Sequence, residues 1–181
     1  MLALLLAVTI TAAPVPAHPA PPKNTVDQLL QKLGKTASED EAKPIEKELL
    51  IQFLQSGSAS VDLLMTRVDA LMGGGDKGNA EKILNAVTQI APNYAEGWHA
   101  RGKLEAENGH DEAAMVSLNK AIKLNPREFA AHVELGDMLE EYGAKPAALA
   151  EYKKALALDP HFEGLDKRVE QLSRDVEGEK I

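Results

Sequence analysis

A small set of residue types recurs in this chain at a fixed spacing of 34 residues. In each copy an alanine follows a glycine after five residues, and a proline follows the same glycine after seventeen. The three copies are Gly75, Ala80 and Pro92; Gly109, Ala114 and Pro126; and Gly143, Ala148 and Pro160. A constant period of this length is typical of helical repeat arrays and not of a domain with one central core. We therefore predict an all-α solenoid, a fold class that usually binds other molecules and rarely catalyses reactions.

Three repeat units of two helices each account for residues 61–94, 95–128 and 129–162. The shared glycine can adopt the left-handed backbone conformation that ends the first helix of each unit. The second helix then runs to about two residues before the shared proline, which cannot continue a helix. Apolar side chains at positions i, i+4 and i+7 of each second helix form a packing stripe. These stripes are Ala80, Leu84 and Val87; Ala114, Leu118 and Ala121; and Ala148, Tyr152 and Ala155.

A fainter copy of the pattern precedes the three units, in residues 27–60. Leu33-Gly34 falls in register with Leu135-Gly136, and Pro44 falls in register with Pro146. We expect both prolines in the first turn of a second helix, where a missing N–H costs little. Ser38 and Glu41 have the spacing of a capping box for that helix. We interpret residues 27–60 as a degenerate repeat that caps the array.

The C-terminal residues 163–181 contain one more amphipathic pattern. Leu165, Val169, Leu172 and Val176 form a single apolar stripe with charged residues around the rest of the helix. We predict a capping helix that covers the apolar face of the last repeat, as the terminal units of solenoids must. The alternative is a helix that is offered to a partner.

The N-terminus has the features of a secretory signal. Residues 1–13 are apolar and uncharged, too short to span a bilayer as a helix, and are followed by small residues. We expect residues 1–17 to be a signal peptide cleaved after Ala17, with residues 18–26 as a Pro-rich tether and the mature protein in the periplasm or secreted. A retained membrane anchor is the alternative, because the segment before the apolar run has no Lys or Arg.

The charge and composition exclude several classes of function. Asp and Glu number 28 against 20 Lys and Arg, and no basic stripe is available to neutralise nucleic-acid phosphates. The acidic surface also argues against docking on anionic lipid. The chain has no cysteine, which excludes disulfides, thiol catalysis and thiolate metal sites.

The repeats resemble the tetratricopeptide repeat (TPR). The second unit has the residues of that family at Trp98, Gly102, Ala114, Leu118, Ala121 and Pro126, and the third has them at Leu135, Gly136, Ala148, Tyr152, Ala155 and Pro160. Glu105 replaces the usual tyrosine-like residue in the second unit, and His132 replaces the tryptophan-like one in the third. As a whole the chain is similar to small exported TPR proteins of Gram-negative bacteria.

This resemblance implies a superhelix whose first helices line a concave groove that binds protein segments. Eight residues are expected to form one ladder along it, which we call the ladder: Met65, Asp69, Met72, His99, Lys103, Val133, Asp137 and Glu140. It is net acidic and contains two methionines, so it suits an extended or helical partner with basic and apolar side chains. The alternative is that these residues are only the solvated side of amphipathic helices.

No set of residues indicates catalysis, a cofactor or a metal site. None of the five histidines forms an i, i+4 ligand pair with another His or Cys, and Gly73-Gly74-Gly75 lacks the Gly-Lys-Ser/Thr of a phosphate loop. We therefore predict a non-enzymatic protein-interaction module. The alternative function is a structural protein that forms homo-oligomers through the ends of the repeat array.

Overall fold

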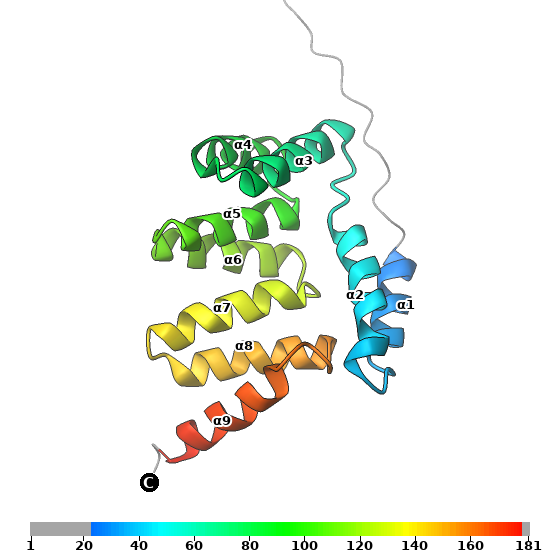
Figure 1. The fold of residues 1–181 in the computed structure, drawn as a ribbon, viewed down its shortest axis with the longest axis vertical. Helices are drawn as coiled ribbons and strands as arrows, with labels where there is room; N and C mark the ends of the chain where they lie inside the picture. The colour runs from blue at the N-terminus through cyan, green and yellow to red at the C-terminus, as the bar shows by residue number, and fades with distance from the viewer. Residues whose placement is uncertain (1–22, 179–181) are drawn as a thin grey trace, which may run out of the picture.

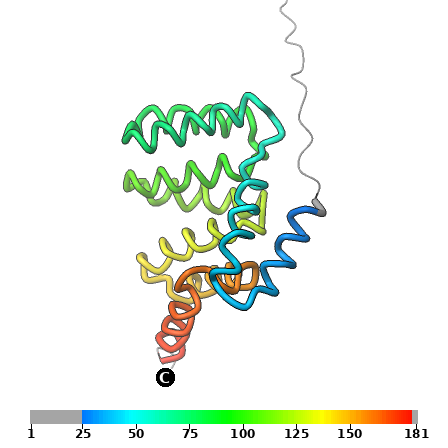
Figure 2. The backbone as a smooth tube through the Cα atoms, turned by 45° about the vertical axis from the view of Figure 1, so that its right-hand side comes forward, coloured from blue at the N-terminus to red at the C-terminus, as the bar shows by residue number. Residues whose placement is uncertain are grey.

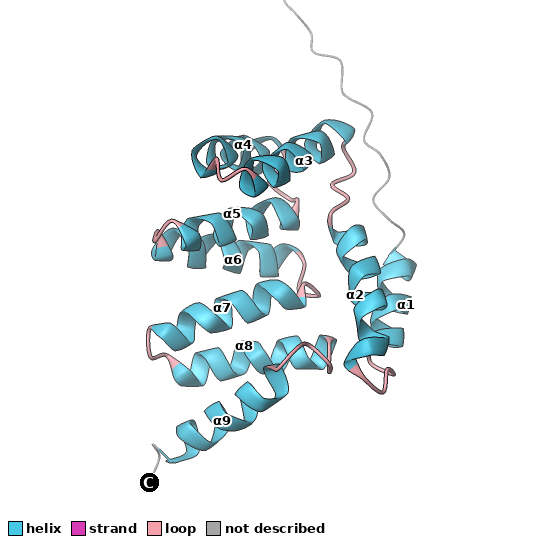
Figure 3. Ribbon diagram, in the orientation of Figure 1, coloured by secondary structure: helices cyan, strands magenta, loops and turns pink. Residues whose placement is uncertain are grey.

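The computed structural model describes residues 23–178, and all regular structure in this range is helical (Figure 3). The helices are α1 (Lys23–Leu33), α2 (Glu39–Phe53), α3 (Ala59–Gly73), α4 (Lys77–Ile90), α5 (Ala95–Glu107), α6 (Asp111–Leu124), α7 (Phe129–Glu141), α8 (Lys145–Leu158) and α9 (Leu165–Gly178).

The three predicted repeat units are stacked helical hairpins, α3/α4, α5/α6 and α7/α8 (Figure 1). Within each hairpin the turn contains a glycine with positive φ: 77° at Gly75, 75° at Gly109 and 72° at Gly143. Only a residue without a Cβ adopts this conformation at low cost, so the glycine ends the first helix as predicted. Each second helix ends two residues before its proline and packs on the first helix of the next element. The prediction of an all-α repeat solenoid is confirmed.

Two glycines inside first helices allow the helices of a hairpin to approach closely. A Cβ at Gly136 would lie 2.5 Å from Cε1 of Tyr152, and a Cβ at Gly102 would lie 2.9 Å from Cγ of Leu118. Tyr152 and Leu118 are among the most buried side chains of α8 and α6. In each of these two hairpins the glycine of the first helix therefore leaves the space that the large side chain of the second helix fills. We call this contact the socket.

The α1/α2 hairpin does not extend the stack. It lies crosswise beside the repeats, along the edge where successive units are joined, and both views place it next to α7 and α8 (Figures 1 and 2). Leu29, Leu33 and Leu49 share one apolar cluster with Phe129 and Val133 of α7.

Polar contacts hold the hairpin in the same place. His161 Nε2 lies 2.8 Å from the carbonyl oxygen of Thr36, and Arg127 Nη2 lies 2.7 Å from Asp27 Oδ1. The hydroxyl of Tyr94 donates to the carbonyl of Leu54 at 2.7 Å, where α2 passes into the linker. The predicted degenerate repeat is thus a helical hairpin, but it is placed against the last unit rather than in front of the first.

The local register of this hairpin also differs from the sequence prediction. Gly34 follows the end of α1, whereas Gly136 lies inside α7, so the two glycines are not equivalent. Ser38 caps α2 by accepting from the backbone N–H of Glu41, which places Pro44 in the second turn of α2 and not in the first. Pro146 does lie in the first turn of α8. Residues 23–26, predicted as the end of the tether, belong to α1.

The C-terminal helix α9 covers α8 as predicted. Leu165, Leu172 and Val176 are buried in the same apolar cluster as Leu149 and Tyr152. The predicted signal peptide, residues 1–17, lies outside the described residues. Within residues 23–178, no helix is both long and apolar enough to cross a membrane.

Candidate functional site

The ladder residues lie on α3, α5 and α7, but they differ in exposure. Met65, His99 and Val133 occupy equivalent positions in their units and are only 5%, 8% and 9% exposed. Met65 and Val133 belong to the apolar clusters of the first and last units, respectively. These two side chains therefore contribute to packing.

The other ladder residues lie closer to the surface. Asp69 and Lys103 are exposed, whereas Met72, Asp137 and Glu140 are half-buried. Partial burial, followed by the nearby charge of Glu96, raises the pKa of Asp69 above its ordinary value. Asp69 and Lys103 are the ladder members most accessible to a partner.

Asp137 and Glu140 already bind an arginine of the chain itself. Arg168 of α9 places Nη1 at 2.8 Å from Asp137 Oδ1 and Nε at 3.0 Å from Glu140 Oε2. Its guanidinium also lies 5.0 Å from the ring centroid of Tyr152, whose hydroxyl donates to both carboxylates. Two members of the ladder are thus used to hold the capping helix.

His99 lies among three carboxylates that the sequence analysis did not connect with it. Nδ1 is 3.4 Å from Glu96 Oε2 and 2.6 Å from Glu128 Oε1, and Nε2 is 3.0 Å from Glu134 Oε2. We call these four residues the His99 cluster. Glu96 comes from α5, Glu128 from the N-cap of α7 and Glu134 from α7, so the cluster joins the second unit to the third.

Burial and charge shift the pKa values of this cluster in different directions. Burial raises the pKa of Glu96 to about 7, although the contact with His99 opposes the shift. Burial acts to lower the pKa of His99, but the carboxylates of Glu128, Glu134 and Glu96 outweigh it and hold this pKa well above the usual value. The charge of His99 in turn outweighs the effect of burial on Glu128 and lowers its pKa. Protons and charges in this cluster are therefore strongly interdependent.

Part of the His99 cluster can be found from the sequence. Glu96 precedes His99 by three residues and thus lies one helical turn away on the same face. Glu134 follows His99 by about one repeat length, which places it at a neighbouring position of the next first helix. A pattern of paired His and Cys ligands includes neither of these glutamates. No local signal identifies Glu128, because its side chain reaches His99 only through the stacking of α7 on α6.

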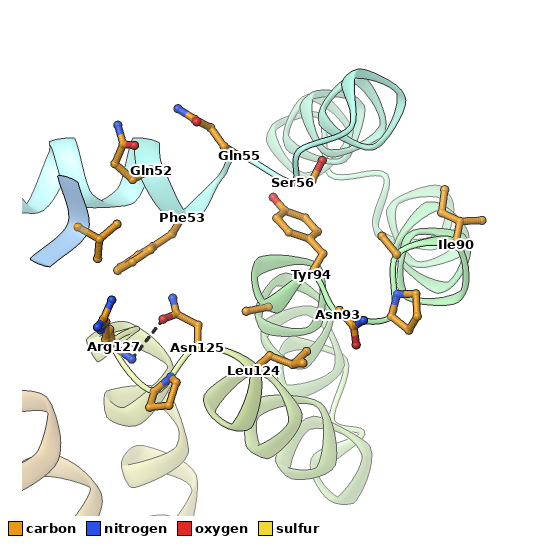
Figure 4. Close-up of a pocket in the computed structure, with 15 residues that line it drawn as sticks. Gln52, Phe53, Gln55, Ser56, Ile90, Asn93, Tyr94, Leu124, Asn125 and Arg127 are labelled. Carbon is orange, nitrogen blue, oxygen red and sulfur yellow. Dashed lines mark hydrogen bonds between the residues drawn. The ribbon is translucent and has the colours of Figure 1, made fainter. Parts of the chain in front are cut away.

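A separate cavity of about 800 Å³ lies between the α1/α2 hairpin and the repeat array (Figure 4). Phe53, Gln55 and Ser56 line it on the hairpin side, and Tyr94 and Asn125 line it on the side of the loops that join the units. This slot is the seam where the hairpin meets the edge of the array.

The middle repeat unit matches a known family model. Residues 95–128, which span α5 and α6, match the family model of the tetratricopeptide repeat. This unit is therefore a tetratricopeptide repeat.

Proteins that are similar over more of the chain include a TPR protein. A TPR repeat-containing protein of Rhizobium etli is 26% identical over 159 residues, which cover 88% of this chain and 78% of the relative. A mutant of the O-GlcNAc transferase of Thermobaculum terrenum is 27% identical with a TM-score of 0.58, over 63% of this chain but only 22% of the transferase.

A third similar protein was solved with a peptide. The type III secretion chaperone SycD of Yersinia enterocolitica, in complex with a peptide of the translocator YopD, has a TM-score of 0.60 at 17% identity. The match covers 68% of this chain and 97% of the chaperone chain. At this identity the similarity concerns the fold.

Proposed function

We propose that this chain is a non-enzymatic protein-interaction module that binds a partner segment along α3, α5 and α7. The partner segment carries basic and apolar side chains, and Asp69 is the principal exposed acidic contact. TPR folds generally act as interaction modules, and a chaperone of similar fold was solved with a bound peptide. Among the ladder carboxylates, Asp137 and Glu140 are bound by Arg168, and Asp69 is the exposed one.

The docking of α9 is the observation that carries this proposal. An amphipathic helix buries its apolar stripe on the array while its arginine binds two ladder carboxylates. A guanidinium held by two carboxylates and stacked on a tyrosine ring is a favourable combination for recognition. On the first unit α5 occupies the place that α9 occupies on the third, so a partner segment with the same chemistry would reach the exposed Asp69 from the solvent side.

Site-specific photo-crosslinking in cells tests the proposal. A photoreactive residue at position 69 or 103 should crosslink the same heterologous protein, through a segment with basic and apolar side chains that mass spectrometry identifies. In the same cells Asp69→Lys should reduce the crosslink formed at position 103 by about tenfold or more, because it replaces attraction by repulsion.

The matched control places the same changes on another helix. Glu112 is an exposed carboxylate in the first turn of α6, outside the ladder. Glu112→Lys should leave the crosslink unchanged, and a photoreactive residue at position 112 should not capture the partner. Equal crosslinking from positions 69 and 112, or no effect of Asp69→Lys, rejects binding at the ladder.

Self-association through the end of the array is the second candidate, and one observation favours it. The α1/α2 hairpin leaves the outer side of α3 uncovered, where Leu63 is 70% exposed and Leu64 and Leu71 line a cavity of about 400 Å³ with Ile83. In the crosslinking experiment this function gives self-crosslinks from position 63 and none to another protein from position 69. Sedimentation velocity then shows a dimer whose fraction rises with concentration and falls in Leu63→Asp.

We also propose that the chain is exported and cleaved after Ala17. The support is the sequence of residues 1–17 described above. N-terminal sequencing of the protein from the cell envelope tests this: a mature N-terminus at His18 agrees with the proposal, and an intact Met1 contradicts it.

A further inference from the structure

The His99 cluster has the geometry of a metal site. One ligand atom from each of Glu96, His99 and Glu128 can be chosen so that all three lie within 4.8 Å of one another. A transition metal bound at about 2.0–2.2 Å to each ligand requires neighbouring ligand atoms to be roughly 3–3.5 Å apart. The separation of His99 Nδ1 and Glu96 Oε2 is 3.4 Å, which lies in this range, whereas Glu128 Oε1 lies 2.6 Å from Nδ1 and must move away from it to admit an ion.

Glu128 is the residue that points to a ligand. It is only 2% exposed, and neither of its carboxylate oxygens accepts a hydrogen bond. Oε1 is close to His99 Nδ1, but the two groups are not aligned as a hydrogen bond. A buried carboxylate without hydrogen-bond partners is costly and requires a compensating positive charge. Without an ion His99 supplies that charge from 2.6 Å, and a bound divalent cation would supply it together with the missing ligand contacts.

Glu134 holds the histidine in the orientation that a metal requires. It lies at Nε2, the ring nitrogen on the other side from Glu96 and Glu128. Metal-bound histidines commonly donate their second ring N–H to a carboxylate, which fixes the tautomer and increases the basicity of the ligating nitrogen. With Nε2–H donating to Glu134, the lone pair of Nδ1 is directed between Glu96 and Glu128.

A route to the cluster is present. A cavity of about 310 Å³ lies between α2 and the N-terminal turns of α5 and α7, and both His99 and Glu128 line it. Lys43, Glu46 and Lys47 form its polar border on α2. An ion or a coordinating water therefore has space beside the two ligands.

We propose that Glu96, His99 and Glu128 bind one divalent transition-metal ion, with Glu134 as the outer partner of the histidine. The mixed imidazole and carboxylate ligands suit Zn²⁺ and, more weakly, Mn²⁺, whereas Mg²⁺ and Ca²⁺ prefer oxygen ligands alone. The ion joins α5 to the start of α7 and so stabilises the junction of the second and third units. In its absence, protons and the charge of His99 balance the carboxylates.

Calorimetric titration of the chelator-treated full chain tests this site with Zn²⁺, Mn²⁺, Mg²⁺ and Ca²⁺ at pH 7.5. We expect one Zn²⁺ per chain, weaker Mn²⁺ binding, and little heat from Mg²⁺ or Ca²⁺. Glu128→Gln and Glu96→Gln should each weaken Zn²⁺ binding at least tenfold, and Glu134→Gln by about tenfold through the histidine. Lowering the pH to 5.5 should also weaken binding, because protons compete with the metal for the ligands.

A surface histidine serves as the matched control. His110 is exposed and precedes the acidic pair Asp111 and Glu112, so it represents a surface position at which Zn²⁺ could bind adventitiously. His110→Gln should leave the affinity unchanged. Loss of binding in His110→Gln with retention in Glu128→Gln overturns the proposal, and so does the absence of Zn²⁺ binding to the wild-type chain at 100-fold excess.

A second measurement does not depend on the variants being folded. X-ray absorption of the Zn²⁺-loaded wild-type chain should show one imidazole and otherwise oxygen ligands. Two or more imidazoles would place the metal elsewhere and overturn the assignment. With one imidazole and a 1:1 stoichiometry, a rise of the wild-type melting temperature on Zn²⁺ addition supports the site at the junction of the two units.

Discussion

At the scale of single residues, hydrogen bonds accommodate the polar departures from the repeat pattern. Trp98 donates its indole N–H to the carbonyl of Pro92 at 3.0 Å, and His132, one repeat later, places Nε2 at 3.2 Å from the carbonyl of Pro126. Glu105 is 6% exposed and accepts from Ser117 at 2.6 Å. The sequence identifies both departures from the family pattern, but their partners become evident only in three dimensions.

Gly136 provides the sharpest prediction at this scale. Gly136→Ala should destabilise the protein by roughly 1–3 kcal/mol, because the new Cβ would lie 2.5 Å from the fully buried ring of Tyr152. Urea unfolding followed by circular dichroism measures the change in the free energy of unfolding. Gly78→Ala is the control, since nothing lies within 4 Å of its added Cβ. Gly78→Ala should be neutral or stabilising by a few tenths of a kcal/mol. Equal effects of the two variants would show that the close contact of Gly136 with Tyr152 does not limit the size of the side chain.

At the scale of secondary-structure elements, the periodic part of the fold is predictable and the α1/α2 hairpin is not. Periodic glycines and prolines place the ends of α3 to α8 within a few residues, since each turn depends on local backbone preferences. The ladder residues lie on the first helices of the units, but periodicity does not predict which of them are buried and which are exposed. The location of α1/α2 depends on the contacts of Thr36 and Asp27 with distant partners, and no periodic signal reports such contacts.

The junction of α5 and α7 should depend on pH when chelator removes divalent metals. The pKa of Glu96 is raised to about 7, so the folded state holds a proton that the unfolded state loses above about pH 4.5. The pKa of His99 is also raised, so above its ordinary pKa the folded state keeps a proton on His99 that the unfolded state loses. Stability contributed by these protons is therefore present at pH 5 and lost as the pH rises to about 8, by on the order of 1–3 kcal/mol.

Urea unfolding at pH 5.5 and 8.0 measures this loss, and Glu96→Gln is the comparison. Glu46, beside Asp159, also has a pKa raised to about 7, chiefly by burial, so other groups add to the wild-type slope. The difference between wild type and Glu96→Gln isolates the cluster: the variant should lose less stability between the two pH values. Identical losses would show that Glu96 does not hold the proton.

At the scale of the whole molecule, the α1/α2 hairpin makes an otherwise local array depend on distant contacts. His161 and Thr36 are 125 residues apart in sequence, whereas each repeat contacts mainly its neighbours. Repeat arrays without such contacts lose stability unit by unit. The hairpin contacts the last unit directly and therefore couples the start of the chain to its end.

Hydrogen exchange of Leu49→Ala tests this coupling. Leu49 is fully buried in the cluster that contains α7 and α8, so its truncation should cost about 2–5 kcal/mol locally. If the hairpin and the last unit are one cooperative body, exchange should accelerate in α1, α2, α7 and α8 together. Leu84→Ala, at a 1% exposed position of α4, should instead accelerate exchange around α3 to α5. If Leu49→Ala accelerates hydrogen exchange in α1 and α2 alone, the hairpin unfolds independently of the last unit.

The position of the hairpin also determines how the protein bears mechanical tension. The described chain enters at α1 and leaves at α9, and both helices pack in the cluster that contains α7 and α8. A pull between the two ends therefore has a direct route from the hairpin through the last unit to α9, while Tyr94 and Arg127 tie the hairpin to the loops after α4 and α6. Most of the first two repeats lies beside this direct route, so their surface should deform less than the last unit when the described ends are pulled apart.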